Sequence, residues 1–319
     1  MSSADETVTP VGTAAAGTAA TTAAPIAPTA AAATLTPTRS RNEILYFALR
    51  NPKFLIGLAV ILAFAVAAVI GPRFTDHAPY DYVGPGSAGP SSEFWLGTTT
   101  FGQDVYTQLV LGLGSTFAVG LLGGGLATLI GMIVGFTAGY RGGWLDEILS
   151  AVTNVVLTIP ILAALILVAA YLSVRGVVIE AVLIGVLNWP WIARAIRAQT
   201  FSLRAREFVD LARLSGVGTS RIISREIAPN MSSYLVLVLI LSFGGAILSA
   251  AFLEFLGLGP TNAVTLGTML NNAVLWSALQ LGLWWWFIPP GLAITMIVGA
   301  LYLMNVGLDE IFNPKLRKT

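Results

Sequence analysis

The sequence lacks cysteine and contains little charge, and both deficits narrow what the chain can be. Of its 319 residues, 55% are hydrophobic and only 10% are charged, whereas a soluble domain carries roughly 25% charged residues. So few charges cannot cover a water-facing surface. The absence of cysteine excludes disulfide bonds and thiolate metal sites. These deficits indicate a chain that lies mostly within a membrane.

Histidine, lysine and net charge are also scarce, which excludes further classes of site. His77 is the only histidine, so we expect no histidine metal site. The net charge of +1 provides no basic field for binding nucleic acid. None of the three lysines follows a glycine. The chain therefore has no Gly-Lys-Ser/Thr phosphate loop, and we expect it not to hydrolyse ATP.

The N-terminal segment differs in composition from the rest of the chain. Residues 1–38 are rich in Ala, Thr and Pro and hold few large apolar side chains. Such a segment cannot bury enough apolar surface to offset the entropy lost on ordering, so we interpret it as a disordered cytoplasmic tail. It also lacks the basic start and apolar run of a signal peptide. Residues 39–319 are interpreted as one transmembrane domain.

Long apolar runs in this domain predict an all-α polytopic membrane protein with six transmembrane helices. A spanning helix needs about 20 mostly apolar residues. Trp189-Pro190-Trp191 interrupts the fourth run, and Pro160, Pro190 and the pair Pro289-Pro290 are expected to break or bend their helices. The predicted spans are Phe54–Gly71, Thr116–Ala138, Ala151–Leu172, Val177–Ala193, Leu235–Leu258 and Trp286–Leu308.

The distribution of Lys and Arg predicts that both termini are cytoplasmic. Cytoplasmic connections of membrane proteins are enriched in these residues. With the N-terminus placed inside, only Arg73 and Arg175 fall in external connections, and the other 15 of the 17 basic residues are cytoplasmic. An even number of spans returns the C-terminus to the cytoplasm, where Lys315, Arg317 and Lys318 agree with this orientation.

Two further patterns have structural interpretations. Glycines at 120, 124, 131, 135 and 139 in the second span share one face and predict close helix packing, with a thin wall beside a solute path as the alternative. Four tryptophans, at positions 276, 284, 285 and 286, close the second of two long external stretches, residues 73–111 and 260–285. We expect most of them to anchor the chain at the membrane interface.

The connection between the fourth and fifth spans, residues 204–229, predicts a two-helix elbow. In its first half, Phe208, Val209 and Ala212 fall on one side, which is typical of a short amphipathic helix. Gly216 and Gly218 then provide a turn, because glycine tolerates positive φ.

The second half predicts another short helix, capped by Ser220 and ended by Pro229, with isoleucines at 222, 223 and 227. The elbow is either a surface helix lying in the lipid headgroups or a docking element for a cytoplasmic partner. The residue pattern alone leaves both interpretations open.

The elbow resembles the coupling loop of ABC importer permeases. That loop has Glu-Ala-Ala, then Gly four residues later, then Pro thirteen residues beyond. Here Asp210-Leu211-Ala212 stands at the triplet, and Gly216 and Pro229 follow at those distances. Asp for Glu and Leu for the first Ala are departures from the pattern.

Motifs outside the elbow resemble the dipeptide, oligopeptide and nickel group of these permeases. The similarity covers residues 45–317 and is greatest to the second permease of dipeptide and oligopeptide importers. The matching motifs are Arg50-Asn51-Pro52, Phe94-Trp-Leu-Gly97-Thr98, Gly102-Gln103-Asp104, Gly139-Tyr-Arg-Gly-Gly-Trp144-Leu-Asp146, Phe252-Leu-Glu-Phe-Leu-Gly257-Leu-Gly259 and Gly307-Leu-Asp309-x3-Asn313-Pro314-Lys-Leu-Arg317.

The resemblance implies a type I ABC importer permease fold in a bacterial cell membrane. It implies a heterodimer with a second permease chain, two cytoplasmic ATPase subunits that bind ATP and Mg, an extracytoplasmic solute-binding protein and a peptide substrate. This chain itself would hold no cofactor. Phe208, Val209 and Val217 would anchor the elbow in an ATPase, with Glu207 and Asp210 at the polar rim. The coupling residues implied are Glu207, Phe208, Val209, Asp210, Leu211, Ala212, Gly216, Val217, Gly218 and Pro229.

Glu254 is the one acid assigned to the interior of a span. It either lines the translocation path or reaches the outer headgroups. With a single such acid, an ion-coupled secondary transporter is the alternative function. A membrane anchor without transport is a further alternative, and nickel is the rival substrate for the same ABC architecture.

Overall fold

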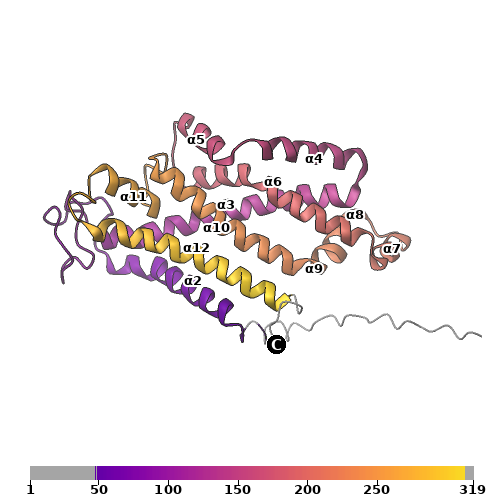
Figure 1. Ribbon diagram of the computed structural model, residues 1–319, viewed down its shortest axis with the longest axis horizontal. Coiled ribbons are helices and arrows are strands. Elements are labelled where there is room, and N and C mark those ends of the chain that lie inside the picture. Colours follow the sequence, from indigo (N-terminus) through magenta and orange to yellow (C-terminus); the bar gives the residue numbers. More distant parts are fainter. Residues whose placement is uncertain (1–46, 48, 313–319) are drawn as a thin grey trace, which may run out of the picture. The chain divides into compact units, whose positions relative to one another are not determined.

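The computed structural model describes residues 47 and 49–312, and in that part of the chain it contains helices and no β-strand (Figure 1). The proposed tail, residues 1–38, and the basic residues at positions 315, 317 and 318 lie outside the described residues. The elements are α2 (Pro52–Ile70), η1 (Gly71–Phe74), α3 (Val105–Arg141), α4 (Gly143–Thr158), α5 (Ile161–Tyr171), α6 (Val177–Arg204), α7 (Glu207–Leu214), α8 (Thr219–Ile222), η2 (Ile223–Ile227), α9 (Ala228–Asn230), α10 (Ser232–Phe255), α11 (Leu266–Leu275) and α12 (Trp284–Phe312).

The helices confirm an all-α polytopic membrane protein. Within residues 49–312, the helices α2, α3, α6, α10 and α12 are each long and apolar enough to cross a membrane. The pair α4 and α5 gives a sixth candidate span, although the two helices are bent by 80°. The six predicted runs therefore correspond to five straight candidates and one broken one.

The third predicted span, Ala151–Leu172, is wrong as a single helix. It divides at Pro160, which stands immediately before α5. Ile159 is extended, with φ −81° and ψ 125°, because a following proline disfavours the helical conformation. By contrast, α6 and α12 run without interruption through Pro190 and through Pro289-Pro290, so those prolines do not break their helices.

The second predicted span begins too late. Helix α3 starts at Val105, eleven residues before Thr116, because Asp104 caps it. The Asp104 carboxylate accepts hydrogen bonds from the backbone N–H of Tyr106 at 3.3 Å and of Thr107 at 2.9 Å. At 1.5 Å per residue, the helix is about 55 Å long, well beyond the roughly 30 Å of a bilayer core.

The glycines of α3 confirm the prediction of close helix packing. A Cβ added at Gly135 would lie 2.7 Å from the carbonyl oxygen of Ala193 in α6. At Gly124, it would lie 2.8 Å from the backbone of Phe243 in α10. The glycines thus serve two partners rather than one, because Gly131, Gly135 and Gly139 face α6 whereas Gly120 and Gly124 face α10.

Helix α12 lies beside α2 (Figure 1), and their contact joins two ends of the chain. The Asn51 side chain accepts a hydrogen bond from the Phe54 N–H at 3.1 Å and so caps α2. Its amide donates to the Gly307 carbonyl at 3.3 Å and to Glu310 at 3.1 Å. Two motifs 256 residues apart therefore form one junction.

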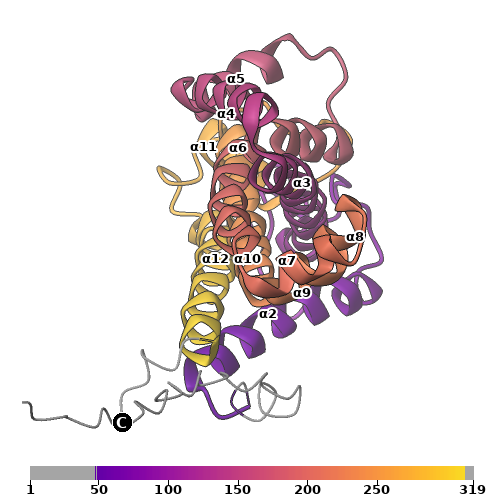
Figure 2. The ribbon, with the colours of Figure 1, turned by 90° about the vertical axis from the view of Figure 1, so that its right-hand side faces the viewer.

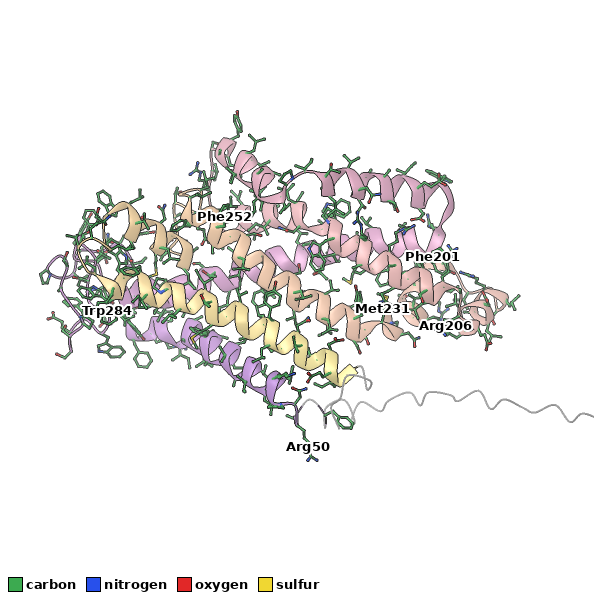
Figure 3. All side chains as sticks on the ribbon, in the orientation of Figure 1. Arg50, Phe201, Arg206, Met231, Phe252 and Trp284 are labelled. Atoms are coloured by element: carbon green, nitrogen blue, oxygen red, sulfur yellow. The ribbon has the colours of Figure 1, made fainter. Side chains whose placement is uncertain are left out.

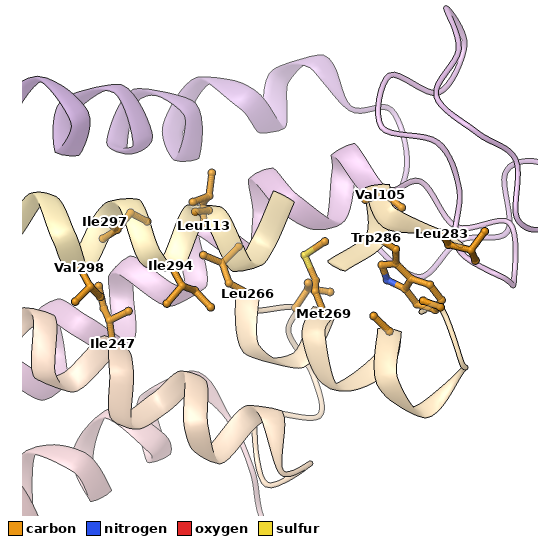
Figure 4. Close-up of a cluster of buried hydrophobic side chains, with 14 of the residues drawn as sticks. Val105, Leu113, Ile247, Leu266, Met269, Leu283, Trp286, Ile294, Ile297 and Val298 are labelled. Carbon is orange, nitrogen blue, oxygen red and sulfur yellow. The ribbon is translucent and has the colours of Figure 1, made fainter. Parts of the chain in front are cut away.

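The largest apolar core gathers side chains of α3, α10, α11 and α12 (Figure 4). Trp286 is almost fully buried in it, so this tryptophan packs inside the bundle and does not face lipid. Trp285 is partly buried and donates from Nε1 to the Thr98 carbonyl at 3.1 Å. Only Trp276 and Trp284 of the four tryptophans are exposed, as an interfacial belt requires.

The described bundle has two distinct ends. Helices α7 and α8 lie at one end, and α11 with residues 75–104 lies at the other (Figures 1 and 2). Figure 3 shows Phe201 and Arg206 at the first end and Trp284 at the second. The candidate coupling residues therefore gather at one end of the bundle.

Candidate functional site

Helix α7 is amphipathic, as predicted. Its inner side carries Val209, which is fully buried, and Phe208 and Ala212, which are half-buried. These side chains pack in an apolar cluster with Tyr140 of α3 and Ile222 of α8. The outer side carries charged residues, so one face of α7 belongs to the fold and the other is available to a partner.

The turn after α7 depends on Gly216. Its φ is +73°, which favours glycine because other residues rarely adopt that region. The Val217 N–H donates to the Ala212 carbonyl at 3.1 Å, and the Gly216 N–H donates to the Arg213 carbonyl at 2.9 Å. This pair of bonds is a Schellman motif. Gly218 has φ −67° and precedes the next helix, so a positive φ there is wrong.

The second half of the elbow departs from the prediction at both ends. Gly218, not Ser220, stands at the start of α8, and Ser220 already lies inside the helix. Pro229 does not end the segment, because it lies in α9 and α10 begins three residues later. Proline has no N–H to continue the regular bonding. The helix before it widens into the π-helical turn η2, in which Ile227 is buried.

The outward surface of α7 offers two leucines. Leu211 is 65% exposed and Leu214 is 86% exposed, and a spacing of three residues places them on the same face. Glu207 and Asp210 are exposed beside them. Together these four residues form what we call the outer face of α7.

The three side chains expected to anchor the elbow in an ATPase pack against this chain itself. Val209 is already covered by this chain, and Phe208 and Val217 pack against the same cluster. None of the three projects fully toward a partner, because the elbow needs them to hold itself against α3. Leu214 was missed by sequence reasoning, although its spacing from Leu211 provides the signal. Gly216, Gly218 and Pro229 are exposed, as a docking element requires.

The elbow is tied to the ends of α3 and α6. The Arg213 Nε donates to the Tyr140 hydroxyl at 3.2 Å, and the guanidinium lies 5.1 Å from the centre of the same ring. This hydrogen bond is the main cause that raises the pKa of Arg213 above its usual value. Arg204 donates to the Tyr140 carbonyl at 3.0 Å. One tyrosine therefore connects three elements.

A polar junction between α4 and α6 was also missed. Arg197 donates to both carboxylate oxygens of Asp146, at 2.5 and 2.6 Å. Arg194 donates to the Asn154 side chain at 2.7 Å. Asn154, Arg194 and Arg197 line a cavity of about 330 Å³. Asp146 belongs to the short motif after α3, so the resemblance pointed to the residue but not to its partner.

Glu254 is enclosed by the bundle. It is fully buried in this chain in this conformation. Its Oε2 accepts a hydrogen bond from the Gly267 N–H at the start of α11, at 3.1 Å. A second acid, Glu180 in the first turn of α6, is buried beside it. The assignment of a single intramembrane acid is therefore wrong.

No cluster of three or more His, Cys, Asp or Glu side chains suited to a metal ion occurs within residues 49–312. The site is thus defined by a protein-facing surface, the outer face of α7, and not by a group of ligands. Its geometry suits recognition by another macromolecule, since two exposed leucines are flanked by acids.

Comparison with known proteins extends the resemblance to most of the chain. Residues 127–318 match the family described as binding-protein-dependent transport system inner membrane component. The dipeptide transport system permease protein DppC of Alkalihalophilus pseudofirmus is 32% identical over 84% of this chain and 88% of its own length. DppC of Bacillus subtilis is 30% identical, covering 84% of both chains. The oligopeptide transport system permease protein OppC of Bacillus subtilis is 30% identical over 84% of this chain and 87% of its own.

Proposed function

The chain belongs to the family of binding-protein-dependent transport system inner membrane components, and from this premise we propose that it is the permease subunit of an ATP-driven importer of di- or oligopeptides. It is a multi-spanning bacterial membrane protein of a transport system. The relatives that carry dipeptide and oligopeptide names support the substrate class. The similarity covers most of each relative, so it applies to the whole permease.

The proposed assembly contains three further kinds of component. A second permease chain forms the other half of the path, and two cytoplasmic ATPase subunits bind ATP and Mg. An extracytoplasmic protein delivers the peptide. The family's dependence on a binding protein supports the last component. This chain contributes no phosphate loop and is proposed to leave hydrolysis to the ATPases.

The observation that carries the proposal is the outer face of α7. Leu211 and Leu214 are exposed at the end of the bundle, with Glu207 and Asp210 beside them. Apolar anchors with a polar rim are the arrangement expected of a protein-binding surface. The proposed partner is the ATPase, and the orientation that places this end in the cytoplasm is part of the proposal.

The proposed mechanism transmits ATPase closure through the elbow. The inner side of α7 is held against α3 by Val209 and Arg213. A displacement of α7 is therefore passed to α3, which packs along α6 through its glycines. Rigid-body rocking of packed helices in two permease chains gives alternating access.

Two alternatives are separated by the same experiment. The buried acids Glu180 and Glu254 favour an ion-coupled secondary transporter, because such proteins bind their ion inside the membrane. Nickel import has no comparable support, since His77 is the only histidine.

Affinity purification of the tagged chain from its native membrane should recover an ATPase and a second permease. Peptides should then stimulate the ATPase through the binding protein. Recovery of the chain without an ATPase would contradict the ABC proposal, and stimulation by nickel would contradict the peptide substrate.

A further inference from the structure

Two glutamates from different helices meet inside the bundle. Glu180 lies in the first turn of α6, and Glu254 lies one residue before the end of α10. Their exposed fractions are 6% and 0%. The Schellman turn at Gly257 ends α10 here and fixes where Glu254 stands, with the Leu258 N–H donating to the Leu253 carbonyl at 3.0 Å. Both acids are therefore held by the fold and not by chance side-chain positions.

The two carboxyl groups lie within hydrogen-bonding range of each other. Neither Glu180 oxygen has a hydrogen-bond donor in the part of the chain that the structure describes, and neither does Glu254 Oε1. Glu254 Oε2 alone is satisfied, by the Gly267 N–H. Three buried carboxyl oxygens are thus without a hydrogen-bond donor in the part of the chain that the structure describes.

Two neighbouring polar side chains, Arg175 and Thr265, both have partners other than the two acids. The Arg175 guanidinium, from the segment before α6, donates to the Gly257 carbonyl at 3.0 Å. It is the only charged group, apart from Glu180 itself, that lines the small cavity beside Glu180. The Thr265 hydroxyl lies within hydrogen-bonding range of Glu254 and is also 3.1 Å from the Thr268 hydroxyl. The adjoining stretches of α5 and α11 contain no charged residue.

Elementary electrostatics excludes two ionised carboxylates in this arrangement. Burial of one unpaired charge is costly, and two like charges in contact repel each other. One proton removes the repulsion and leaves a single negative charge, which is stabilised because the neutral carboxyl group donates a hydrogen bond to its ionised neighbour. The cavity beside Glu180 is only about 10 Å³, about the space for one water molecule, so no larger hydrogen-bond donor fits beside the pair.

We propose that Glu180 and Glu254 share one proton and form a carboxylic acid–carboxylate pair that joins α6 to α10. Through Glu254 Oε2 and the Gly267 N–H, the pair also holds the start of α11. The pair lies toward the end of the bundle opposite the elbow. A hydrogen bond that depends on one proton therefore holds α6, α10 and α11 together at that end. This proton site does not depend on the identity of the transported solute.

The proposal predicts how stability depends on pH. At neutral pH the folded chain still holds this proton, whereas two exposed glutamates in the unfolded chain are already ionised, so stability falls as pH rises. Replacement of Glu180 with glutamine supplies a permanent amide donor to the Glu254 carboxylate. Glu180→Gln should therefore remove this dependence and leave the fold intact.

Infrared spectroscopy of the purified full-length chain in detergent tests the proposal directly. At neutral pH, the wild type should show absorption of a protonated carboxyl group. Glu180→Gln and Glu254→Gln should each lose it, while Glu147→Gln, at an exposed acid of α4, should retain it. Equal absorption in all three variants, or its absence from the wild type, would overturn the shared proton.

Two further measurements keep the proposal open to refutation if a variant fails to fold. The wild-type melting temperature should fall by about 2 °C or more between pH 6 and pH 9, and a flat profile would count against the pair. Arg175→Gln should leave the infrared absorption unchanged. If the absorption appears only in that variant, Arg175 neutralises the acids and the shared proton is wrong.

Discussion

Arg213 of α7 donates from Nε to the Tyr140 hydroxyl at the end of α3, at a distance of 3.2 Å. The two residues lie 73 positions apart. Their bond, with the burial of Val209 beneath it, makes α7 an extension of the membrane bundle and not a loose flap. Force applied to the exposed side of α7 therefore has a direct route into a spanning helix.

The outer face of α7 should be required for association with the ATPase. Leu214→Asp places a charge where an apolar side chain is 86% exposed, so it should leave the fold intact and abolish copurification of the ATPase. The control is Leu281→Asp, at a leucine that is 57% exposed at the other end of the bundle. An unchanged yield of ATPase with Leu214→Asp would exclude this surface as the docking site.

Substitutions on the inner side of α7 should affect the stability of the chain and not its association with the ATPase. Val209→Ala removes a buried side chain and should lower the free energy of unfolding by about 2 kcal/mol. Leu211→Ala, on the exposed side, should change it by less than about 0.5 kcal/mol. Thermal unfolding of both purified variants measures the difference. Equal effects would mean that α7 is not packed as described.

Substitution by alanine should have different effects at the two glycines of the elbow. Gly216→Ala forces a side chain into positive φ and should cost about 1–2 kcal/mol, which weakens the turn and lowers the coupling of transport to ATP hydrolysis. Gly218→Ala needs no unusual backbone angle and should have little effect. Transport per ATP hydrolysed, measured in the reconstituted complex, separates them. Similar losses in both variants would show that backbone angle is not what matters here.

Two glycines of α3 allow a test in which the same substitution should change stability in opposite directions. Gly135→Ala would bring a Cβ to 2.7 Å from the Ala193 carbonyl oxygen and should destabilise the chain by about 1–3 kcal/mol. Gly125→Ala meets no atom within 4 Å and should stabilise the helix by about 0.5–1 kcal/mol. Melting temperatures should move in opposite directions; a common direction would contradict the α3–α6 packing.

Much of the fold could be predicted because it depends on local composition. Apolar runs located the spans, and the spacing of Phe208, Val209 and Ala212 located α7 and its inner side. Gly216 was assigned its positive φ from residue type alone. In each case the physical cause, either burial in lipid or backbone freedom, acts within a few residues of sequence.

The errors concern features that depend on distant residues. Nothing local distinguishes Pro160, where a helix ends, from Pro190, where packing against α3 holds the helix together. Glu180 lies inside the predicted fourth span and was visible in the sequence, but its proximity to Glu254, 74 positions later, was not. Val209 was assigned to a partner because sequence shows an apolar side but not which surface covers it.

The claim that the elbow faces the cytoplasm can be tested by one labelling measurement. The natural sequence has no cysteine, so Leu214→Cys supplies a single thiol on the outer face of α7. A membrane-impermeant thiol reagent should label it in inside-out vesicles and leave it unlabelled in right-side-out vesicles. Labelling from the outside would contradict the orientation and, with it, docking of a cytoplasmic ATPase at this surface.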